Sequence, residues 1–244
     1  MKVACVQMDV LHCRKPENLE KALYLALEAV AKGAEIIVFP EVFSTGFCYE
    51  DFDHAAENLP SPTLENLACF SEANDCILIG SVIQKDIVEN NFTTKENSFK
   101  EKANSFTEKE KDISGSKNSP NSALYYNLGF CFESGALAGT YRKTHPFKNE
   151  NQYFSRGNSI EPIPLKNLNL KIGFEICYEL RFPEIARKLA LAGSDLLVTT
   201  AAFPNPRSEH WKTLVKARLS KIRFRILPAT VLVLLPTAAT SEAQ

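Results

Sequence analysis

The chain has 244 residues, which is enough to bury one large core as a single α/β domain. Its apolar fraction of 45% and charged fraction of 23% are typical of a globular protein. A formal net charge of −1 provides no electrostatic basis for binding nucleic acid or an acidic membrane surface, so we expect neither partner.

The first half of the chain alternates strand and helix patterns. A helix opens at Pro16, and its apolar stripe stops at Gly33. A short continuous apolar strand then ends at Pro40 and Glu41. In chain order, the expected elements are a strand at 2–8, a helix at 16–33, a strand at 35–39, a helix at 63–74 and a strand at 76–83.

Hairpins appear in the middle of the chain. Two apolar strands, 123–133 and 136–143, flank a turn at Ser134 and Gly135. Further buried-type strands are expected at 170–177 and 195–200, and helices at 183–192 and 208–218. This order predicts an α/β layered sandwich with a mixed sheet, because an all-parallel sheet would not contain a hairpin.

One internal segment does not fit a compact domain. Residues 88–122 are polar, poor in apolar side chains and contain an imperfect tandem repeat at 96–109. Such a stretch buries too little surface to offset its ordering entropy, so we expect a disordered surface insertion. The alternative is a partner-binding loop or a substrate lid.

The seven cysteines are an odd number and form no CxxC pair. Several lie in apolar runs, as Cys5 and Cys131 do, which favours reduced cytosolic thiols over a disulfide framework or a zinc site. The N-terminus lacks signal-peptide architecture. The longest apolar stretch, 226–239, is too short to span a bilayer and contains Pro228 and Pro236. We therefore expect a cytoplasmic protein.

Cys177 lies where a strand pattern gives way to a helix pattern, within the segment KIGFEICYELRFPE at 171–184. A nucleophile at such a turn projects from a strand end into a cleft, and the following amides can face an oxyanion. The alternative is a buried cysteine that packs as a small hydrophobe.

Three charged residues also stand beside apolar strands. Glu41 follows the strand at 35–39, Lys143 ends the strand at 136–143, and Glu150 lies seven residues later. A partly desolvated carboxylate has a raised pKa and suits a base or acid. A loop glutamate, a solvent-exposed lysine and a surface acid are the alternative interpretations.

Glutamate, lysine and cysteine together form a chemically specific set. The carboxylate takes the thiol proton, the cation stabilises a tetrahedral intermediate, and the same acid protonates a departing amine. This set suits cleavage of a carbon–nitrogen bond through a thioester.

The chain resembles the nitrilase superfamily of carbon–nitrogen hydrolases. Four segments carry the resemblance: IIVFPEVFSTGF around Glu41, GTYRKTHPF around Lys143, IGFEICYELRFPE around Cys177, and AAFPNPRSEHW followed by KAR at 216–218. The N-terminal VACVQMD also matches the family's opening strand. The likeness covers residues 1 to about 218, apart from the insertion.

The resemblance implies a four-layer α-β-β-α sandwich with two mixed sheets. By motif match, Glu41 is the general base, Lys143 the oxyanion partner and Cys177 the nucleophile. Glu150 corresponds to a supporting glutamate behind the lysine, and the amide of Tyr178 completes the oxyanion hole. The family also implies a homodimer, an amide substrate with water, and no metal or organic cofactor.

The chain departs from the family pattern in two places. Glu179 stands where members usually carry aspartate, which lengthens a side chain near the nucleophile and could shift the start of the next helix. From about Leu219 to the last residue the tail is atypical. Members of the family usually continue with Glu-Asn-Gln after the KAR segment. One possible codon string for residues 220–224 encodes Glu-Asn-Gln-Val when it is read in a shifted frame, from its third base. We therefore hypothesise that the tail is a frameshifted reading of an ordinary family C-terminus, which resequencing of the gene can test. Residues 230–235 would then either cover an open sheet edge or promote aggregation.

The leading hypothesis is a hydrolase of small linear amides or carbamoyl compounds, with nitriles as a less favoured substrate. The first alternative is a truncated, non-catalytic remnant or binding protein on the same fold. The second is an interaction module that acts through residues 88–122.

Overall fold

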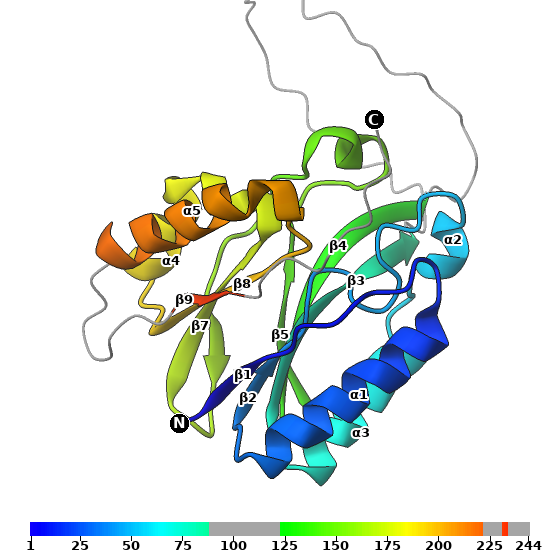
Figure 1. The fold of residues 1–244 in the computed structure, drawn as a ribbon, viewed down its shortest axis with the longest axis horizontal. Coiled ribbons are helices and arrows are strands. Elements are labelled where there is room, and N and C mark those ends of the chain that lie inside the picture. Colours follow the sequence, from blue (N-terminus) through cyan, green and yellow to red (C-terminus); the bar gives the residue numbers. More distant parts are fainter. Residues whose placement is uncertain (88–122, 222–230, 234–244) are drawn as a thin grey trace, which may run out of the picture.

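Two β-sheets pack face to face between two layers of helices in the computed structural model, which describes residues 1–87, 123–221 and 231–233 (Figure 1). The first sheet has the order β1-β2-β3-β4-β5, with β1 at Val3–Cys5, β2 at Ile36–Val38, β3 at Ile77–Ile87, β4 at Ala123–Glu133 and β5 at Ala136–Arg142. The second sheet has the order β6-β7-β8-β9, with β6 at Ile163–Leu165, β7 at Leu170–Ile176, β8 at Leu196–Thr200 and β9 at Val231–Val233. The helices are α1 at Lys15–Ala31, α2 at Phe52–Ala55, α3 at Pro62–Ala73, α4 at Pro183–Leu191 and α5 at Ser208–Lys221. Three 3-10 helices, η1 at Lys148–Gln152, η2 at Cys177–Arg181 and η3 at Asn205–Arg207, lie in the connections.

Both sheets are mixed, as predicted. β1, β2 and β3 are parallel, whereas β3, β4 and β5 form an antiparallel meander. In the second sheet β6 is antiparallel to β7, and β7, β8 and β9 are parallel. The carboxyl ends of β2 and β5 therefore lie at the same edge of the first sheet, because β5 runs parallel to β2.

The core consists of layers that follow the two faces of each strand. Val38 and Ile79 of the first sheet pack with Phe174 of the second in the layer between the sheets. The adjacent residue Ile37 instead faces the layer that contains Leu67 of α3. Because β2 is buried on both faces, its apolar residues run without interruption. Together with α4 and α5 on the other side, this confirms the four-layer sandwich.

One glycine permits the close approach of the two sheets. A Cβ atom built on Gly129 of β4 would lie 2.5 Å from the Phe174 ring. The aromatic ring therefore occupies the space that any other residue at 129 would need.

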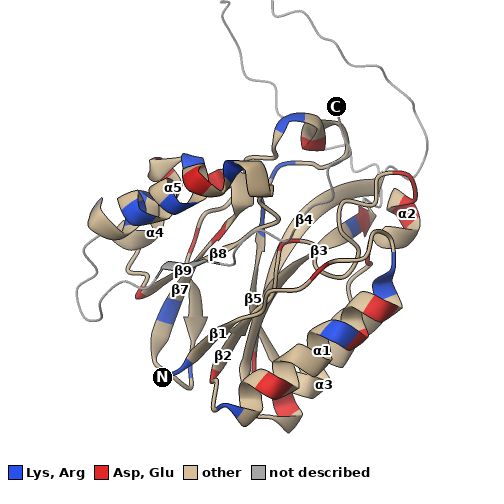
Figure 2. Cartoon of the chain, in the orientation of Figure 1, with Lys and Arg blue, Asp and Glu red and all other residues tan. Residues whose placement is uncertain are grey.

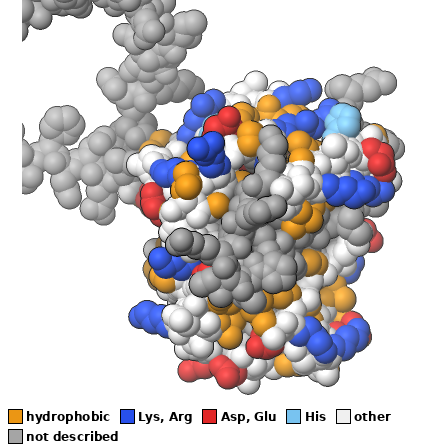
Figure 3. All heavy atoms as spheres, turned by 90° about the vertical axis from the view of Figure 1, so that its left-hand side faces the viewer, with side chains coloured by type: hydrophobic (Ala, Val, Ile, Leu, Met, Phe, Trp, Pro, Cys, Tyr) orange, Lys and Arg blue, Asp and Glu red, His pale blue; other side chains and the backbone are white. Residues whose placement is uncertain are grey.

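Charged side chains are spread over the outside of the fold. Figure 2 shows basic and acidic residues interspersed along α1 and α5, whereas α3 carries acidic residues only. Figure 3 shows the face that carries α4 and α5, where hydrophobic side chains lie between charged ones. Leu191 at the end of α4 is exposed. This mixture agrees with the near-zero net charge.

Cys13 and Cys48 form a disulfide with a Cα–Cα distance of 5.2 Å, so the expectation that the thiols are reduced is wrong for this pair. The two cysteines are 35 residues apart in the chain. They meet because the turn before α1 pairs with the loop after β2, where the Cys13 amide donates to the carbonyl of Thr45. Their spacing in the sequence carries no sign of this contact.

Most predicted elements are confirmed within a few residues, but the shortest were missed. β6, α2 and the 3-10 helices are too short to show a periodic pattern. The predicted strand at 2–8 is hydrogen-bonded as a strand only over β1.

Two predictions fall wholly or mostly outside the described residues. The insertion at 88–122 lies outside them, as do 222–230 and 234–244 of the atypical tail, so both interpretations stay predictions. Within the tail, β9 pairs in parallel with β8 and covers that edge, with Val231 opposite Leu197. In the described ranges, no helix combines the length and apolar character needed to cross a membrane.

Candidate active site

Three strand ends bring the predicted chemical groups together. Glu41 lies three residues beyond β2, Lys143 directly follows β5, and Cys177 directly follows β7. β2 and β5 end at one edge of the first sheet, and β7 belongs to the sheet that faces it. Lys143 is 102 positions from Glu41 and 34 positions from Cys177, and the three residues meet at one end of the sandwich.

A buried lysine lies between two buried glutamates. Lys143 Nζ donates to Glu41 Oε1 at 2.7 Å and to Glu150 Oε2 at 2.8 Å. Burial alone lowers the pKa of Lys143, but the two carboxylates outweigh it and hold that pKa above its ordinary value. The ammonium group therefore stays charged at neutral pH.

Glu150 titrates closer to neutrality than an ordinary carboxyl group. Burial raises its pKa to about 6, and the negative charge of Glu41 adds to the rise, whereas Lys143 opposes it. The three side chains thus form one coupled cluster whose protonation changes in weakly acidic solution.

Further donors fix the orientation of the Glu41 carboxylate. Asn127 Nδ2 donates to Glu41 Oε1 at 2.9 Å, and the amide of Ala202 donates to Oε2 at 3.1 Å. Sequence analysis missed Asn127. The available signal was a polar side chain in the middle of an apolar strand, where a buried amide needs a partner.

Cys177 is held in a strained conformation beside this cluster. Its φ is +51°, in the left-handed region that non-glycine residues rarely occupy. The thiol and the Glu41 carboxylate line the same cavity. Burial, and then Glu41, raise the pKa of the thiol well above its ordinary value, and Lys143 only partly opposes this. The Cys177 thiol is therefore neutral at rest, and the Glu41 carboxylate lies on the same cavity.

Glu41 is followed by a second strained residue. Val42 has a φ of +43°, which is unfavourable for a β-branched side chain, and its amide donates to Ser81 Oγ at 2.9 Å. One strained position is therefore Cys177 itself, and the other directly follows Glu41.

Glu179 connects the cysteine turn to the lysine turn. Its Oε1 accepts from the amide of Thr144 at 2.7 Å and from the Tyr141 hydroxyl at 2.8 Å, and its Oε2 accepts from the amide of Ile176 at 2.8 Å. Burial alone raises the pKa of Glu179, but the hydrogen bonds outweigh it and hold the pKa below its ordinary range. The longer side chain does not displace the next helix, because α4 begins at Pro183 as predicted.

A cavity of about 190 Å³ opens onto these groups. Glu41, Glu150 and Cys177 line it, and so does Tyr178, whose ring centroid lies 4.9 Å from that of Phe147. The remaining lining side chains are mainly aromatic rings and two guanidinium groups: Phe47, Phe147, Phe203, Arg181 and Arg207. The cavity therefore suits a small molecule with an apolar part and a polar or anionic end.

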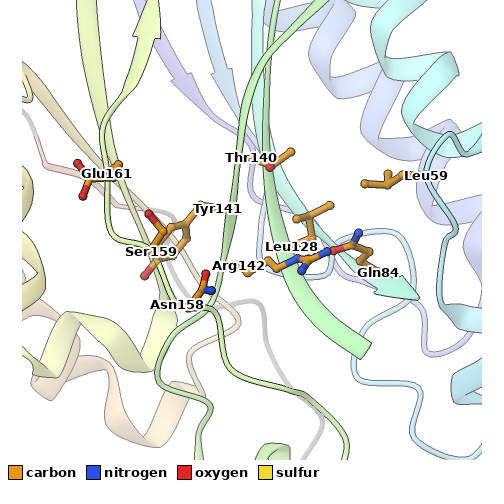
Figure 4. Close-up of a pocket in the computed structure, with 9 residues that line it drawn as sticks. All are labelled: Leu59, Gln84, Leu128, Thr140, Tyr141, Arg142, Asn158, Ser159 and Glu161. Atoms are coloured by element: carbon orange, nitrogen blue, oxygen red, sulfur yellow. The ribbon is translucent and has the colours of Figure 1, made fainter. Parts of the chain in front are cut away.

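A larger cavity of about 260 Å³ lies elsewhere, against β3, β4 and β5 (Figure 4). Its cation, Arg142, donates to Gln84 at 3.0 Å and to Asp86 at 2.7 Å, and is thereby neutralised. None of the residues that line it is a cysteine. The smaller cavity, and not this one, contains Cys177.

Comparisons with known proteins identify a family and a fold for this chain. A family model described as carbon-nitrogen hydrolase matches residues 2–224. A probable nitrilase of Schizosaccharomyces pombe is 32% identical over 223 residues, which cover 88% of this chain and 69% of that protein. A 2-oxoglutaramate amidase of Bacillus subtilis is 28% identical over 219 residues, which cover 88% of this chain and 70% of the relative.

Solved structures show the same fold. The crystal structure of Saccharomyces cerevisiae Nit3, a member of the nitrilase superfamily, superposes with a TM-score of 0.69 at 23% identity. The match covers 90% of this chain and 71% of Nit3.

Proposed function

The chain belongs to the carbon–nitrogen hydrolase family, and from this premise we propose that it hydrolyses a small linear amide or carbamoyl compound through a cysteine thioester. The observation that carries the proposal is that the Cys177 thiol shares one cavity with Glu41, whose carboxylate is itself paired with Lys143. A lone buried cysteine would need neither a base nor a buried cation beside it.

The first half of the reaction forms the thioester. Glu41 takes the thiol proton as the Cys177 sulfur attacks the carbonyl carbon of the amide. The negative charge that develops on the substrate oxygen is stabilised by the Lys143 ammonium group and the amide of Tyr178. Glu41 then gives its proton to the nitrogen, the carbon–nitrogen bond breaks, and ammonia or an amine leaves.

The second half reverses the roles of the same groups. Glu41 takes a proton from water, which attacks the thioester carbonyl, and the carbon–sulfur bond breaks. The carboxylic acid product leaves, and Cys177 regains a proton. Glu150 supports this cycle by holding Lys143 in place through the 2.8 Å ion pair.

Two arginines at the cavity suggest the kind of substrate. Arg181 and Arg207 line it, and their guanidinium groups lie 5.7 Å from the ring centroids of Phe203 and Phe147, respectively. Among the described residues, neither arginine forms an ion pair with a carboxylate side chain. We propose that they favour an amide that also carries a carboxylate, as in the 2-oxoglutaramate amidase relative. Arg207→Gln should raise KM for carboxylate-bearing amides about tenfold and leave KM for neutral amides nearly unchanged. Equal effects on both classes would contradict this assignment.

An amide panel with ammonia release as the readout tests the main proposal. The wild-type protein should release ammonia, and Cys177→Ala should not. Intact-mass spectrometry after rapid acid quench should detect an acyl adduct, which peptide mapping should place on Cys177 and not on Cys5 or Cys131. A folded wild-type protein that binds amides without turnover would instead support the non-catalytic alternative.

The homodimer and the cytoplasmic location expected from the sequence are also part of this proposal. The face with α4 and α5 carries exposed hydrophobic residues such as Leu191 and Leu219, which suits contact with a second copy. Light scattering after size-exclusion chromatography tests the dimer: a monomer at micromolar concentration would reject it. Cell fractionation tests the location.

A further inference from the structure

Four metal-binding side chains meet at a second site near the start of α1. His12 and Cys13 lie in the turn before this helix, and Cys48 and Glu50 lie in the loop between β2 and α2. Their donor atoms all lie within 4.8 Å of one another. His12 Nε2 is 2.5 Å from Glu50 Oε1, and Cys13 Sγ is 3.4 Å from the same oxygen.

The donor set matches one metal closely. Two thiolates, an imidazole and a carboxylate supply four ligands of the types that Zn²⁺ binds tetrahedrally, at about 2.0–2.3 Å from the metal. Donor atoms around such an ion are about 3–4 Å apart, so the observed cluster needs only small side-chain movements. We propose that His12, Cys13, Cys48 and Glu50 form a Zn²⁺ site when the two cysteines are reduced. This departs from the expectation of no metal, which rested on the family resemblance and on the number and surroundings of the cysteines.

The disulfide and the zinc site exclude each other, because the same two sulfur atoms form both. A dithiol reductant delivers two electrons to the Cys13–Cys48 bond, becomes a disulfide itself, and leaves two thiols. Zn²⁺ then displaces the two thiol protons to solvent and binds the thiolates. Either state joins the turn before α1 to the loop after β2.

The site is also close to the candidate active site along the chain. Cys48 follows Phe47, which lines the 190 Å³ cavity, and precedes Tyr49, whose ring stacks on Tyr153 at 4.2 Å. Backbone bonds already join this loop to the turn before α1, since the Cys13 amide donates to Thr45. A metal there would fix the loop that begins at Glu41. The zinc proposal does not depend on the proposed hydrolase function, and its test needs no activity.

Cobalt substitution provides a direct test on the full chain. Reduced protein is titrated with Co²⁺ alone, and the visible and near-ultraviolet absorbance is recorded. We expect one Co²⁺ per chain, with tetrahedral visible bands and a thiolate charge-transfer band, and quantitative displacement by Zn²⁺. Protein oxidised to the Cys13–Cys48 disulfide should show neither band. Zn²⁺ should also raise the melting temperature of the reduced protein only.

Variants of the two exposed ligands keep the test independent of folding, whereas replacing the buried Cys48 would also disturb the packing of its loop. His12→Ala and Glu50→Gln should each weaken Zn²⁺ binding at least tenfold, in competition with a chromophoric chelator. His54→Ala and Cys69→Ser, an exposed histidine and an exposed cysteine outside the cluster, are the matched controls and should change nothing. Absence of the cobalt bands in reduced protein would overturn the proposal. So would equal binding by the oxidised form, or unchanged affinity in both ligand variants.

Discussion

Glu175 is a buried carboxyl group that should make the protein less stable as the pH rises. It lies on β7, two residues before Cys177, and is fully buried. Its Oε1 accepts from Thr199 Oγ1 at 2.8 Å, but its Oε2 has no hydrogen-bond partner among the described residues. Burial raises its pKa to about 7, Glu179 adds to the rise, and Thr199 and Arg218 oppose it.

The size of the effect follows from the difference between the folded and unfolded states. The pKa rises from an ordinary value of 4.5 to about 7 on folding. Ionisation therefore favours the unfolded chain, and the free energy of unfolding falls as the pH rises from about 4.5 to about 7. The loss is about 1 kcal/mol at pH 5 and about 3 kcal/mol at pH 8, at 1.4 kcal/mol per pKa unit.

Glu175→Gln removes this ionisation and so tests the reasoning. Its free energy of unfolding minus that of wild type should be about 2 kcal/mol larger at pH 8 than at pH 5, so the variant gains stability relative to wild type as the pH rises. A constant packing or hydrogen-bonding cost of the amide cancels in this comparison. Urea unfolding followed by circular dichroism at several pH values gives both curves.

A matched variant sharpens the test. Thr199→Val removes the hydroxyl that lowers the pKa of Glu175, while keeping the side-chain shape. It should therefore make the loss of stability between pH 5 and pH 8 larger than in wild type. Parallel pH curves for wild type and Glu175→Gln would refute the argument.

Three further predictions concern the polar cluster and its support. Lys143→Gln should lower kcat about 10²- to 10³-fold in ammonia-release assays, because it removes the positive charge that would stabilise the oxyanion. A variant that turns over amide as fast as wild type would exclude that role. In wild type, kcat/KM should fall below pH about 6 as the cluster takes up a proton, since burial raises the pKa of Glu150 to that value. Glu150→Gln should remove or shift this acid limb of the pH profile, and an unchanged limb would assign it to another group. Glu179→Gln should lower the free energy of unfolding by about 2 kcal/mol at pH 7 in urea unfolding. The glutamine side chain has one oxygen, so it cannot accept from the amides of both Thr144 and Ile176 as the two carboxylate oxygens do. A cost near zero would show that these bonds are replaced.

The sequence by itself determined the order and kind of the main elements and the places where chemistry was expected. Apolar periodicity is a local property, so α1, α3 and the β4–β5 hairpin could be predicted within a few residues. Glu41, Lys143 and Cys177 stood out because each is a polar or reactive side chain at the end of an apolar strand.

Only the tertiary structure decided which distant residues touch. The contact of Asn127 with Glu41, the hydrogen bond from Thr144 to Glu179 and the meeting of Cys13 with Cys48 join positions 35 to 86 residues apart. Such contacts depend on strand register and on how the two sheets stack, which no local pattern encodes. The pKa values of Glu150 and Glu175 belong to the same class, because burial raises them, and burial exists only once the layers have packed.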